Sequence, residues 1–260
     1  VCSGYTFAEM VKYIGRPLDT PSGTARLDMS EIDLQIIKDN IHDPIWRICN
    51  LYKIVNEDGF EVRFKPKPPQ MKVLEDLFIK GWRRQIILKA RQIGFSTLIE
   101  IIFCDQIVFN DNFQCSVVAD TADNAKKLLE VKLKFAYDHL LPDFRKGAGT
   151  LEKNKSVITL ENGSNCTAGT RQRSGTNQGL HVSEWGKVAH TDPARSKEIK
   201  TGALPTVPVH GIIFIESTFE GGKGGDFYAL IKQAMETKDE DMTALDFHFQ
   251  FFPWHDEERY

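Results

Sequence analysis

Short apolar runs alternate with helical patterns from residue 70 onward, and this alternation constrains the fold more than any other feature. The apolar runs, which we predict to be strands, are 85–88, 115–119, 179–182 and 211–215. Helical spacing of apolar residues is found between and after them, at 71–80, 97–108, 122–140 and 227–235. A hairpin is predicted over 156–168. Buried strands linked by helices are typical of a mainly parallel sheet covered on both faces, so we predict an α/β fold.

Residues 1–60 follow a different pattern and are predicted to form a small N-terminal appendage, with the main domain at 61–260. Helices are predicted at 5–14 and 30–40, on either side of a segment rich in Gly, Pro, Ser and Thr. A hairpin is predicted over 52–64. The prolines of 65–69 bias their neighbours away from helix, which favours a boundary there.

Composition excludes several classes of protein. Apolar residues make up 41% and charged residues 27% of the 260 residues, as in ordinary globular proteins. A formal net charge of −3 excludes a uniformly basic nucleic-acid coat but allows a local basic surface. No apolar run approaches the ~20 residues that cross a bilayer. Five cysteines without paired spacing indicate reduced thiols in a cytosol.

The segment between the first strand and the first long helix of the main domain is the best candidate for a phosphate-binding loop, because backbone amides and a helix N-terminus attract anions. It consists of Lys89, Ala90, Arg91, Gln92, Ile93, Gly94, Phe95, Ser96 and Thr97. Gly94 and Ser96 fit the pattern GxxxxGK[ST], but Phe95 stands at the lysine position and Lys89 at the first glycine position.

By pattern alone, the segment would equally suit a plain strand-turn-helix connection. The cations beside the glycine favour a phosphate site, and Lys89 and Arg91 are the available replacements for the missing lysine. One charge-assisted hydrogen bond contributes about 1.5–3 kcal/mol, so phosphate binding would weaken substantially if no other cation replaced the lysine.

Two further strands end in polar residues. The strand at 179–182 is followed by Ser183 and Glu184, and a carboxylate there would act as a general base for water. The strand at 211–215 is followed by Glu216, Ser217 and Thr218, which would face the ligand crevice at the carboxyl edge of a parallel sheet. A strand followed by Glu is common, and the second group would also serve as a strand cap before the Gly-rich segment 221–225.

Other polar residues are weaker candidates. His181, inside a predicted strand, is expected to be a core histidine, and Trp82 and Trp185 are expected to pack in the core. The acidic runs 239–241 and 256–258 are expected to be solvated loops. A group of basic residues flanks the strand at 179–182, and its members are Arg171, Arg173, Lys187, Arg195, Lys197 and Lys200. These side chains are either merely solvated or in contact with DNA phosphates. As a further alternative, Arg171 or Arg173 would act as an arginine finger on the ATP of a neighbouring subunit.

Taken in order, these segments resemble the large terminase subunit of tailed bacteriophages, the motor that packages DNA into procapsids. The resemblance covers roughly 64–260. Residues 89–97 look like a deviant Walker A motif, 182–184 like a Walker B motif with serine in place of aspartate, and 216–218 like the coupling motif. Gln70 looks like the adenine-reading glutamine. Residues 252–254 and Tyr260 look like the segment that closes the ATPase domain.

The resemblance implies a P-loop NTPase fold of the additional-strand type, with ATP and Mg²⁺ as ligands. Gln70 would read adenine and residues 89–97 would hold the phosphates, with Arg91 assisting catalysis. Ser96 and, through water, Ser183 would hold Mg²⁺. Glu184 would activate water, and Glu216, Ser217 and Thr218 would couple hydrolysis to movement of DNA.

The same resemblance implies partners. These are double-stranded viral DNA, the portal protein and the small terminase subunit, with a homo-oligomeric ring docked transiently on the procapsid in the host cytoplasm and a monomer in isolation. The nuclease half of the family has no counterpart in this sequence, so nuclease activity is not expected.

Two other functions remain open. A helicase-like DNA-dependent ATPase shares a glutamine motif and a Ser/Thr coupling motif, but it would need a second motor domain. A degenerate nucleotide-binding or structural module without hydrolysis is favoured by Phe95 and Ser183, which both replace groups that most P-loop enzymes use.

Overall fold

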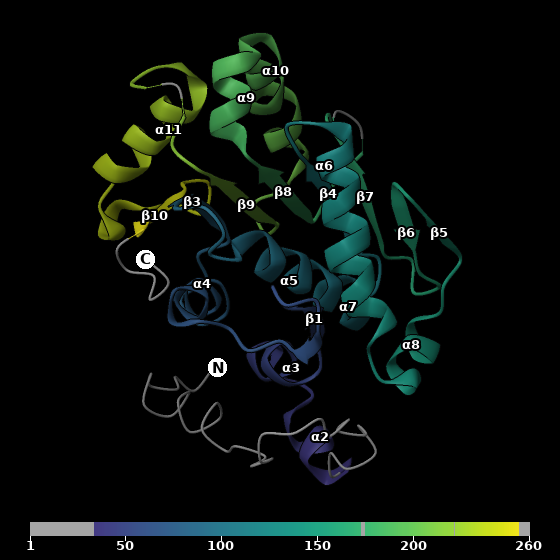
Figure 1. Ribbon diagram of the computed structural model, residues 1–260. Helices are drawn as coiled ribbons and strands as arrows, with labels where there is room; N and C mark the ends of the chain where they lie inside the picture. The colour runs from purple at the N-terminus through teal and green to yellow at the C-terminus, as the bar shows by residue number, and fades with distance from the viewer. Residues whose placement is uncertain (1–33, 173–174, 221, 255–260) are drawn as a thin grey trace.

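A computed structural model describes residues 34–172, 175–220 and 222–254. Through the middle of this part runs an eight-stranded sheet in the order β10-β3-β9-β8-β4-β7-β6-β5 (Figure 1). The strands from β10 to β7 pair in parallel, and β5 and β6 are antiparallel. The bounds are β3 Arg84–Lys89, β4 Gln114–Val118, β5 Glu152–Asn154, β6 Val157–Thr159, β7 Asn165–Gly169, β8 Gly179–Ser183, β9 Ile212–Ser217 and β10 His248–Phe252. The predicted α/β fold is confirmed.

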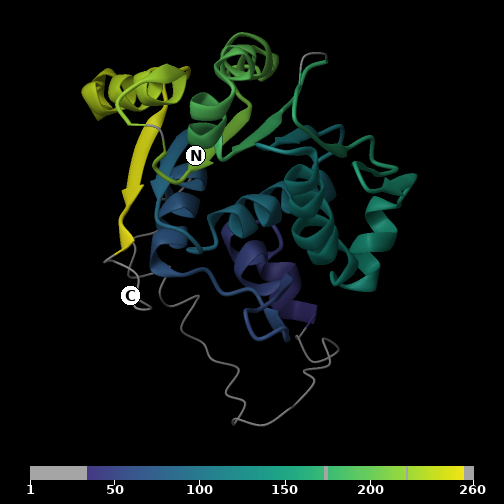
Figure 2. The same ribbon diagram turned by 45° about the horizontal axis from the view of Figure 1, so that its top comes forward.

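Helices cover both faces of the sheet (Figures 1 and 2). One face is covered by α3 Pro44–Asn50, α4 Pro68–Phe78, α5 Phe95–Phe109, α6 Ala122–Lys127, α7 Phe135–Asp138 and α8 Pro142–Ala148. The other is covered by α9 Trp185–Thr191, α10 Pro193–Glu198 and α11 Gly225–Glu236, together with the short helices Ile199–Ala203 and Leu204–Thr206. A further short helix, Asp239–Asp241, has no buried residue.

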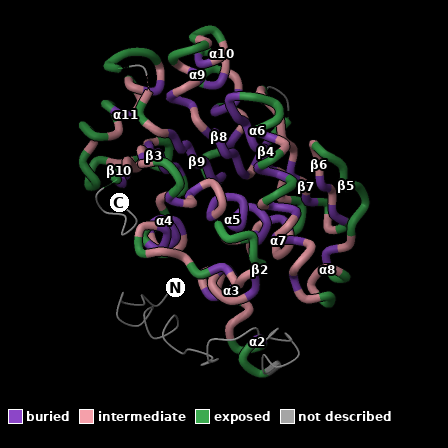
Figure 3. Tube along the Cα trace, viewed as in Figure 1, coloured by how far each residue is buried: buried purple, intermediate pink, exposed green. Residues whose placement is uncertain are grey.

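Alternation along the strands divides the core between the two faces. In β9, Ile212 and Phe214 belong to the cluster under α5, whereas Ile213 and Ile215 belong to the cluster under α11. Successive strand residues point to opposite faces, so a strand that is apolar throughout serves both. β8 and β9 are accordingly buried along their whole length (Figure 3).

The helix predicted at 122–140 is present, but its middle is π-helical. The π-helical turns, Leu128–Lys134, lie between α6 and α7 and pack along α5. Leu129, Leu133, Ala136 and Leu140, the residues at helical spacing, are all buried. π-Turns of this kind are often found at functional sites.

Several predicted bounds differ from the structure. α4 begins at Pro68 rather than at residue 71, because prolines at the first helical positions have no amide to satisfy. Gln70 therefore lies in the first turn of α4 and not before it. β10, α3, α9 and α10 were not predicted as separate elements.

The N-terminal part consists of α2 Leu34–Asn40, α3 and the antiparallel hairpin β1 Lys53–Val55 and β2 Glu61–Arg63, as predicted for 52–64. Trp46, Ile48 and Tyr52 join the same apolar cluster as α5. The division of the chain at residue 60 stays a prediction. The helix predicted at 5–14, the first residues of that predicted at 30–40, Arg173, the acidic run 256–258 and Tyr260 lie outside the described residues.

Within the described ranges, no helix combines the length and the apolar character that crossing a membrane requires.

Candidate functional site

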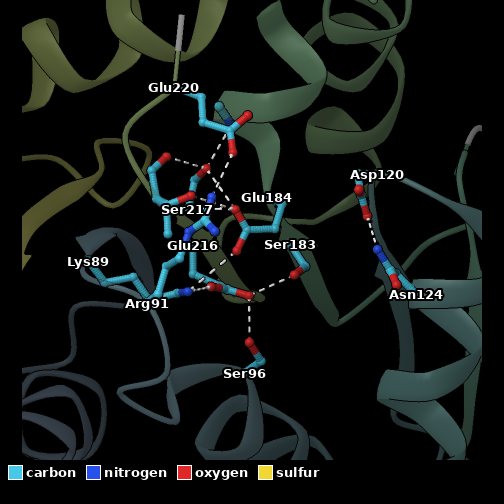
Figure 4. Close-up of polar contacts among 12 residues, drawn as sticks. Lys89, Arg91, Ser96, Asp120, Asn124, Ser183, Glu184, Glu216, Ser217 and Glu220 are labelled. Atoms are coloured by element: carbon cyan, nitrogen blue, oxygen red, sulfur yellow. Dashed lines mark hydrogen bonds and ion pairs between the residues drawn. The ribbon is translucent and has the colours of Figure 1, made fainter. Parts of the chain in front are cut away.

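Three parallel strands end together at the carboxyl edge of the sheet. Register pairs Leu88 of β3 with Ser217 of β9, and Glu216 of β9 with Ser183 of β8. The polar residues that follow the apolar runs are thereby gathered in one place, as the sequence predicted (Figure 4). β9 is the additional strand, because it lies between the strand before the candidate loop and the strand before Glu184.

The loop after β3 is a tight turn into α5. Gln92 and Gly94 both adopt positive φ angles, of 61° and 86°. A Cβ atom at Gly94 would lie 3.0 Å from Nε2 of Gln70, so both the backbone angle and the close approach favour glycine. α5 begins at Phe95, and its N-cap residue is Gly94, which has no side chain to bond the first amides. Its first amides are therefore suited to an anion.

Lys89 lies between two carboxylates. Its Nζ is 2.9 Å from Oε2 of Glu216 and 3.4 Å from Oε1 of Glu184, and only 7% of its side chain is exposed. Burial alone would lower the pKa of Lys89, but the two carboxylates raise it above its ordinary value. The loop strand therefore ends in a buried, charged ammonium group.

Arg91 lies differently. The strand ends at Lys89, and the Arg91 side chain is 78% exposed, with Nη2 3.9 Å from Oε1 of Glu220. Of the two cations proposed to replace the missing lysine, the structure buries one within the cluster of strand ends and leaves the other at the surface.

Phe95, at the usual lysine position, points into the core. It is fully buried, and its ring packs against Phe252 of β10 with centroids 4.7 Å apart. β10 also holds the first residue of the loop, because the amide of Ala90 donates to the carbonyl of Phe252 (2.9 Å). Position 95 thus contributes to packing rather than to a charged site.

Glu216 is the most connected residue of the cluster. Its Oε1 accepts hydrogen bonds from Ser96 (2.8 Å) and Ser183 (2.7 Å), while Oε2 pairs with Lys89. Burial would raise the pKa of Glu216, but Lys89, the nearby His181 ring and the Ser183 hydroxyl hold it well below its ordinary value. The carboxylate is ionised although it has no exposed surface.

Glu184 is bound to the predicted coupling residues. Its Oε2 accepts from the Thr218 hydroxyl (3.2 Å), the Thr218 amide (3.3 Å) and the Ser217 hydroxyl (3.4 Å). Its side chain is 28% exposed, more than that of Lys89 or Glu216. The backbone φ of Glu184 is 56°, a left-handed conformation that is uncommon for residues other than glycine and that is often found at functional sites.

Gln70 connects α4 to the loop. Its Nε2 donates to the carbonyl of Gly94 (2.9 Å), and its Oε1 accepts from the amide of Lys67 (2.9 Å). The side chain is buried. Gln70 therefore lies against the loop, and a primary amide still has a second N–H with which to bind a ligand.

The sequence did not reveal that further ionisable residues, Glu100 and Lys132, lie near Glu216 and His181 inside the fold. His181 is in the core, as predicted, but its Nδ1 is 2.7 Å from Oε1 of Glu100 in α5, and its Nε2 is 3.4 Å from Oε1 of Glu216. Lys132, on the π-helical turns, lies within electrostatic range of Glu100 and Glu216, and burial lowers its pKa. Since Glu100 lies in a stretch predicted as a largely apolar helix and Lys132 in one predicted as an amphipathic helix, neither pattern places them beside Glu216, and only the fold does so.

The basic group around the Glu184 strand is largely paired with carboxylates in three dimensions. The pairs are Arg171–Glu198, Lys187–Asp120, Arg195–Asp192 and Lys200–Asp226, at 2.7–3.8 Å. Arg171, Lys187 and Lys200 nonetheless keep 63%, 45% and 48% of their side chains exposed. The predicted roles of this group, DNA contact and an arginine finger, stay predictions.

A Mg²⁺ ion fits the oxygen atoms of the cluster. The hydroxyls of Ser96 and Ser183 both meet one carboxylate oxygen of Glu216, and Mg²⁺ prefers oxygen ligands. Among the described residues, no group of three or more His, Cys, Asp or Glu side chains is arranged to hold a metal. An ion here would therefore also need water and substrate phosphates, which is usual for Mg²⁺.

The fold and the arrangement of the strand ends define a P-loop-type α/β domain with an additional strand. More particularly, it is the fold of the ATPase domain of phage large terminases. The large terminase of bacteriophage HK97 matches with a TM-score of 0.61 at 19% identity, over 82% of this chain and 43% of that one. The ATPase domain of the Thermus phage P74-26 large terminase matches with a TM-score of 0.55 at 14% identity, over 73% of this chain and 81% of that one.

A mutant of the latter domain gives a TM-score of 0.54 at 17% identity over the same shares. The chain thus spans less than half of the HK97 large terminase. Scans of protein-family profiles and of curated protein sequences gave no match.

Proposed function

We propose that this chain is the ATPase motor domain of a phage terminase large subunit, which hydrolyses ATP to move double-stranded viral DNA into a procapsid. The observation that carries the proposal is the meeting of Lys89, Ser96 and Glu184 at the carboxyl ends of β3 and β8, with β9 between them. The structural likeness to the large terminases of HK97 and P74-26 supports it.

In this proposal the loop binds the phosphates of ATP. The amides of Phe95, Ser96 and Thr97 at the start of α5 would donate to phosphate oxygens, and Lys89 would supply the positive charge. Lys89 is a better candidate than Arg91, because it is already held within the cluster. Residues 90–94 would shape the turn, and Gln70 would contact adenine from α4.

Glu184 would accept the proton of the attacking water. Its carboxylate is the more exposed of the two at the strand ends, so water reaches it more readily than it reaches Glu216. Bound Mg²⁺, held by Ser96 and through water by Ser183, would neutralise charge on the phosphate oxygens. Catalysis would rest on positioning and electrostatic stabilisation.

Coupling would begin at the bonds between Glu184 and the 217–218 segment. Any change in the position of the Glu184 carboxylate changes three contacts with Ser217 and Thr218. Those residues lead directly into the segment before α11, so a shift there would be passed to the surface. We infer that Glu216, Ser217 and Thr218 transmit loss of the terminal phosphate.

The partners belong to the same proposal. Double-stranded DNA, the portal protein and the small terminase subunit would meet this domain in a homo-oligomeric ring on the procapsid, in the host cytoplasm. Arg171, with most of its side chain exposed, would be available to a neighbouring subunit's ATP or to DNA phosphates. In isolation we expect a monomer with slow turnover, because a neighbour's arginine would be missing from the site.

Phosphate release from ATP and Mg²⁺, with and without double-stranded DNA, tests the proposal. Wild-type protein should hydrolyse ATP, and Glu184→Gln should keep nucleotide binding while losing roughly 10²–10⁴-fold in turnover. Glu236→Gln, which neutralises an exposed carboxylate on α11, is the control and should stay within threefold of wild type. Binding without hydrolysis by wild type would favour the degenerate nucleotide-binding module instead.

A further inference from the structure

The carboxylate of Glu216 lies beside Ser183, the position at which most P-loop enzymes have an aspartate. Ser183 ends β8 without a negative charge, but Glu216 lies directly across from it in the register of β8 and β9. The Ser183 hydroxyl donates to Oε1 of Glu216 at 2.7 Å. The negative charge that Ser183 lacks is therefore present next to it, on the neighbouring strand.

Glu216 also reaches both phosphate-binding features of the loop. It accepts from the Ser96 hydroxyl at 2.8 Å and pairs with Lys89 at 2.9 Å (Figure 4). These two contacts come from opposite ends of the loop, the end of β3 and the first turn of α5. One carboxylate thus fixes the loop cation relative to the loop hydroxyl.

Stability alone is a poor reason for this arrangement. A buried carboxylate costs several kcal/mol of desolvation, and apolar residues of similar volume commonly replace buried ion pairs without loss. Glu216 has no exposed surface, and it is surrounded by polar groups on three elements. Lys89, Ser96, His181 and Ser183 contact it, and Glu100, Glu184 and Lys132 are its charged neighbours.

We propose that Glu216 takes over, from the neighbouring strand, the place of the carboxylate that is missing at position 183. It is a positioning residue: it orients Lys89 and Ser96 toward phosphate and Mg²⁺ and supplies negative charge beside the ion. The assignment rests on the proposed function, because it presumes that the loop binds a nucleotide with a divalent ion. It gives Glu216 a role in addition to the coupling that it is proposed to share with Ser217 and Thr218, which contact Glu184.

The first test is Glu216→Gln, which keeps the shape of the side chain and removes its charge. Binding of Mn²⁺ in the presence of ADP, followed by electron paramagnetic resonance, reports the site without requiring turnover. Losing one charge-assisted contact should weaken Mn²⁺ binding about 10- to 100-fold. Glu100→Gln is the matched control, because Glu100 is equally buried and bonds the same His181 but is not bonded to the loop. It should bind Mn²⁺ within threefold of wild type, whatever its melting temperature.

The second test transfers the carboxylate from position 216 on β9 to position 183 on β8. Glu216→Ser should lose Mn²⁺ binding. The double variant, Ser183→Asp with Glu216→Ser, should bind Mn²⁺ at least tenfold more tightly than Glu216→Ser alone. A merely structural role of Glu216 would not give recovery that depends on the register partner.

The outcomes separate the two proposals. Two results would overturn the role of Glu216 and leave the ATPase proposal standing. In the first, wild-type protein binds Mn²⁺ and ADP, and Glu216→Gln binds Mn²⁺ with an affinity within twofold of wild type. In the second, a folded double variant binds Mn²⁺ no better than Glu216→Ser. If wild-type protein binds no nucleotide, the proposed function fails and the role of Glu216 fails with it.

Discussion

The rings of Phe95 and Phe252 pack with their centroids 4.7 Å apart, and this contact joins the start of α5 to the edge strand β10. Phe95 stands where the pattern GxxxxGK[ST] has lysine. The aromatic residue is therefore part of the core. In the proposed function the cation of the loop comes from another position, and we expect Lys89, on the strand before the loop, to supply it.

Phe95→Lys should accordingly harm the protein instead of restoring a standard loop. Removing the ring from a fully buried position and burying an ammonium group there should lower the free energy of unfolding by at least about 3 kcal/mol. Phe95→Leu, which keeps an apolar side chain, should lose less than about 1.5 kcal/mol. Urea denaturation of both variants checks this, and a Phe95→Lys protein as stable as wild type with tighter ATP binding would contradict it.

Lys89→Ala and Arg91→Ala should have unequal effects on nucleotide binding. Lys89 is buried against Glu184 and Glu216, whereas most of the Arg91 side chain is exposed. We expect Lys89→Ala to weaken ATP binding by about 10- to 100-fold, the equivalent of one charged hydrogen bond, and Arg91→Ala to weaken it less than threefold. Calorimetric titration, at a temperature where circular dichroism shows both variants folded, measures this. The reverse ranking would assign the cation to Arg91.

Arg47 and Asp105 should contribute much more to stability than an exposed pair of the same length. Arg47 binds Asp105 through two nitrogens, with a shortest contact of 2.6 Å, and both side chains are nearly or fully buried. Arg47→Met leaves the Asp105 carboxylate buried and unpaired by arginine, so about 3–5 kcal/mol of unfolding free energy should be lost.

Lys53 and Glu61 form the matched comparison, also at 2.6 Å but with 29% and 41% of their side chains exposed. Lys53→Met should cost no more than about 1 kcal/mol. Equal losses for the two variants, measured by urea denaturation, would mean that α3 is not held to α5 by the buried pair.

Asp76 should make the domain sensitive to acid. Burial would raise the pKa of this carboxyl, but the contact with His248 and the hydrogen bond from Lys80 hold it below its ordinary value of 3.8. A carboxylate with a lowered folded-state pKa stabilises the fold above pH 3.8, and this contribution is lost as pH falls through the lower, folded-state value.

The stability difference between wild type and Asp76→Asn should therefore be full near pH 7 and shrink in acid below about pH 4. Melting temperatures over a pH series measure it. Asp143→Asn, which removes an exposed carboxylate, should show little difference at either end. A difference for Asp76→Asn that grows in acid would contradict the assignment.

The sequence was informative where a pattern reports burial directly. The apolar runs 85–88, 211–215 and 179–182 became the adjacent strands β3, β9 and β8, and the polar residues after them met at one edge because parallel strands must align there. β10 was not predicted, although His248–Phe252 alternates polar and apolar residues as a strand does. Its burial runs against that pattern, since Gln250 is buried and Phe251 is 56% exposed.

Contacts between distant residues were beyond the sequence. Glu100 lies in the apolar helix α5, and nothing in the local pattern indicates that its partner is His181, 81 residues later. The same holds for Phe95 and Phe252. Spacing also indicated nothing of the left-handed backbone at Glu184, which depends on how β8 turns into α9.

The position of β3 in the sheet has a consequence for the order in which the protein matures. Both neighbours of β3, β9 and β10, are made more than a hundred residues after it, and the Ala90 amide has its carbonyl partner at Phe252. Pairings of such sequence separation form late, because a long loop must close first. A nascent chain on the ribosome would therefore be able to pair β4 with β7 and β8 before the candidate phosphate loop after β3 could take shape, and the Ala90 amide would find its partner only once β10 had emerged.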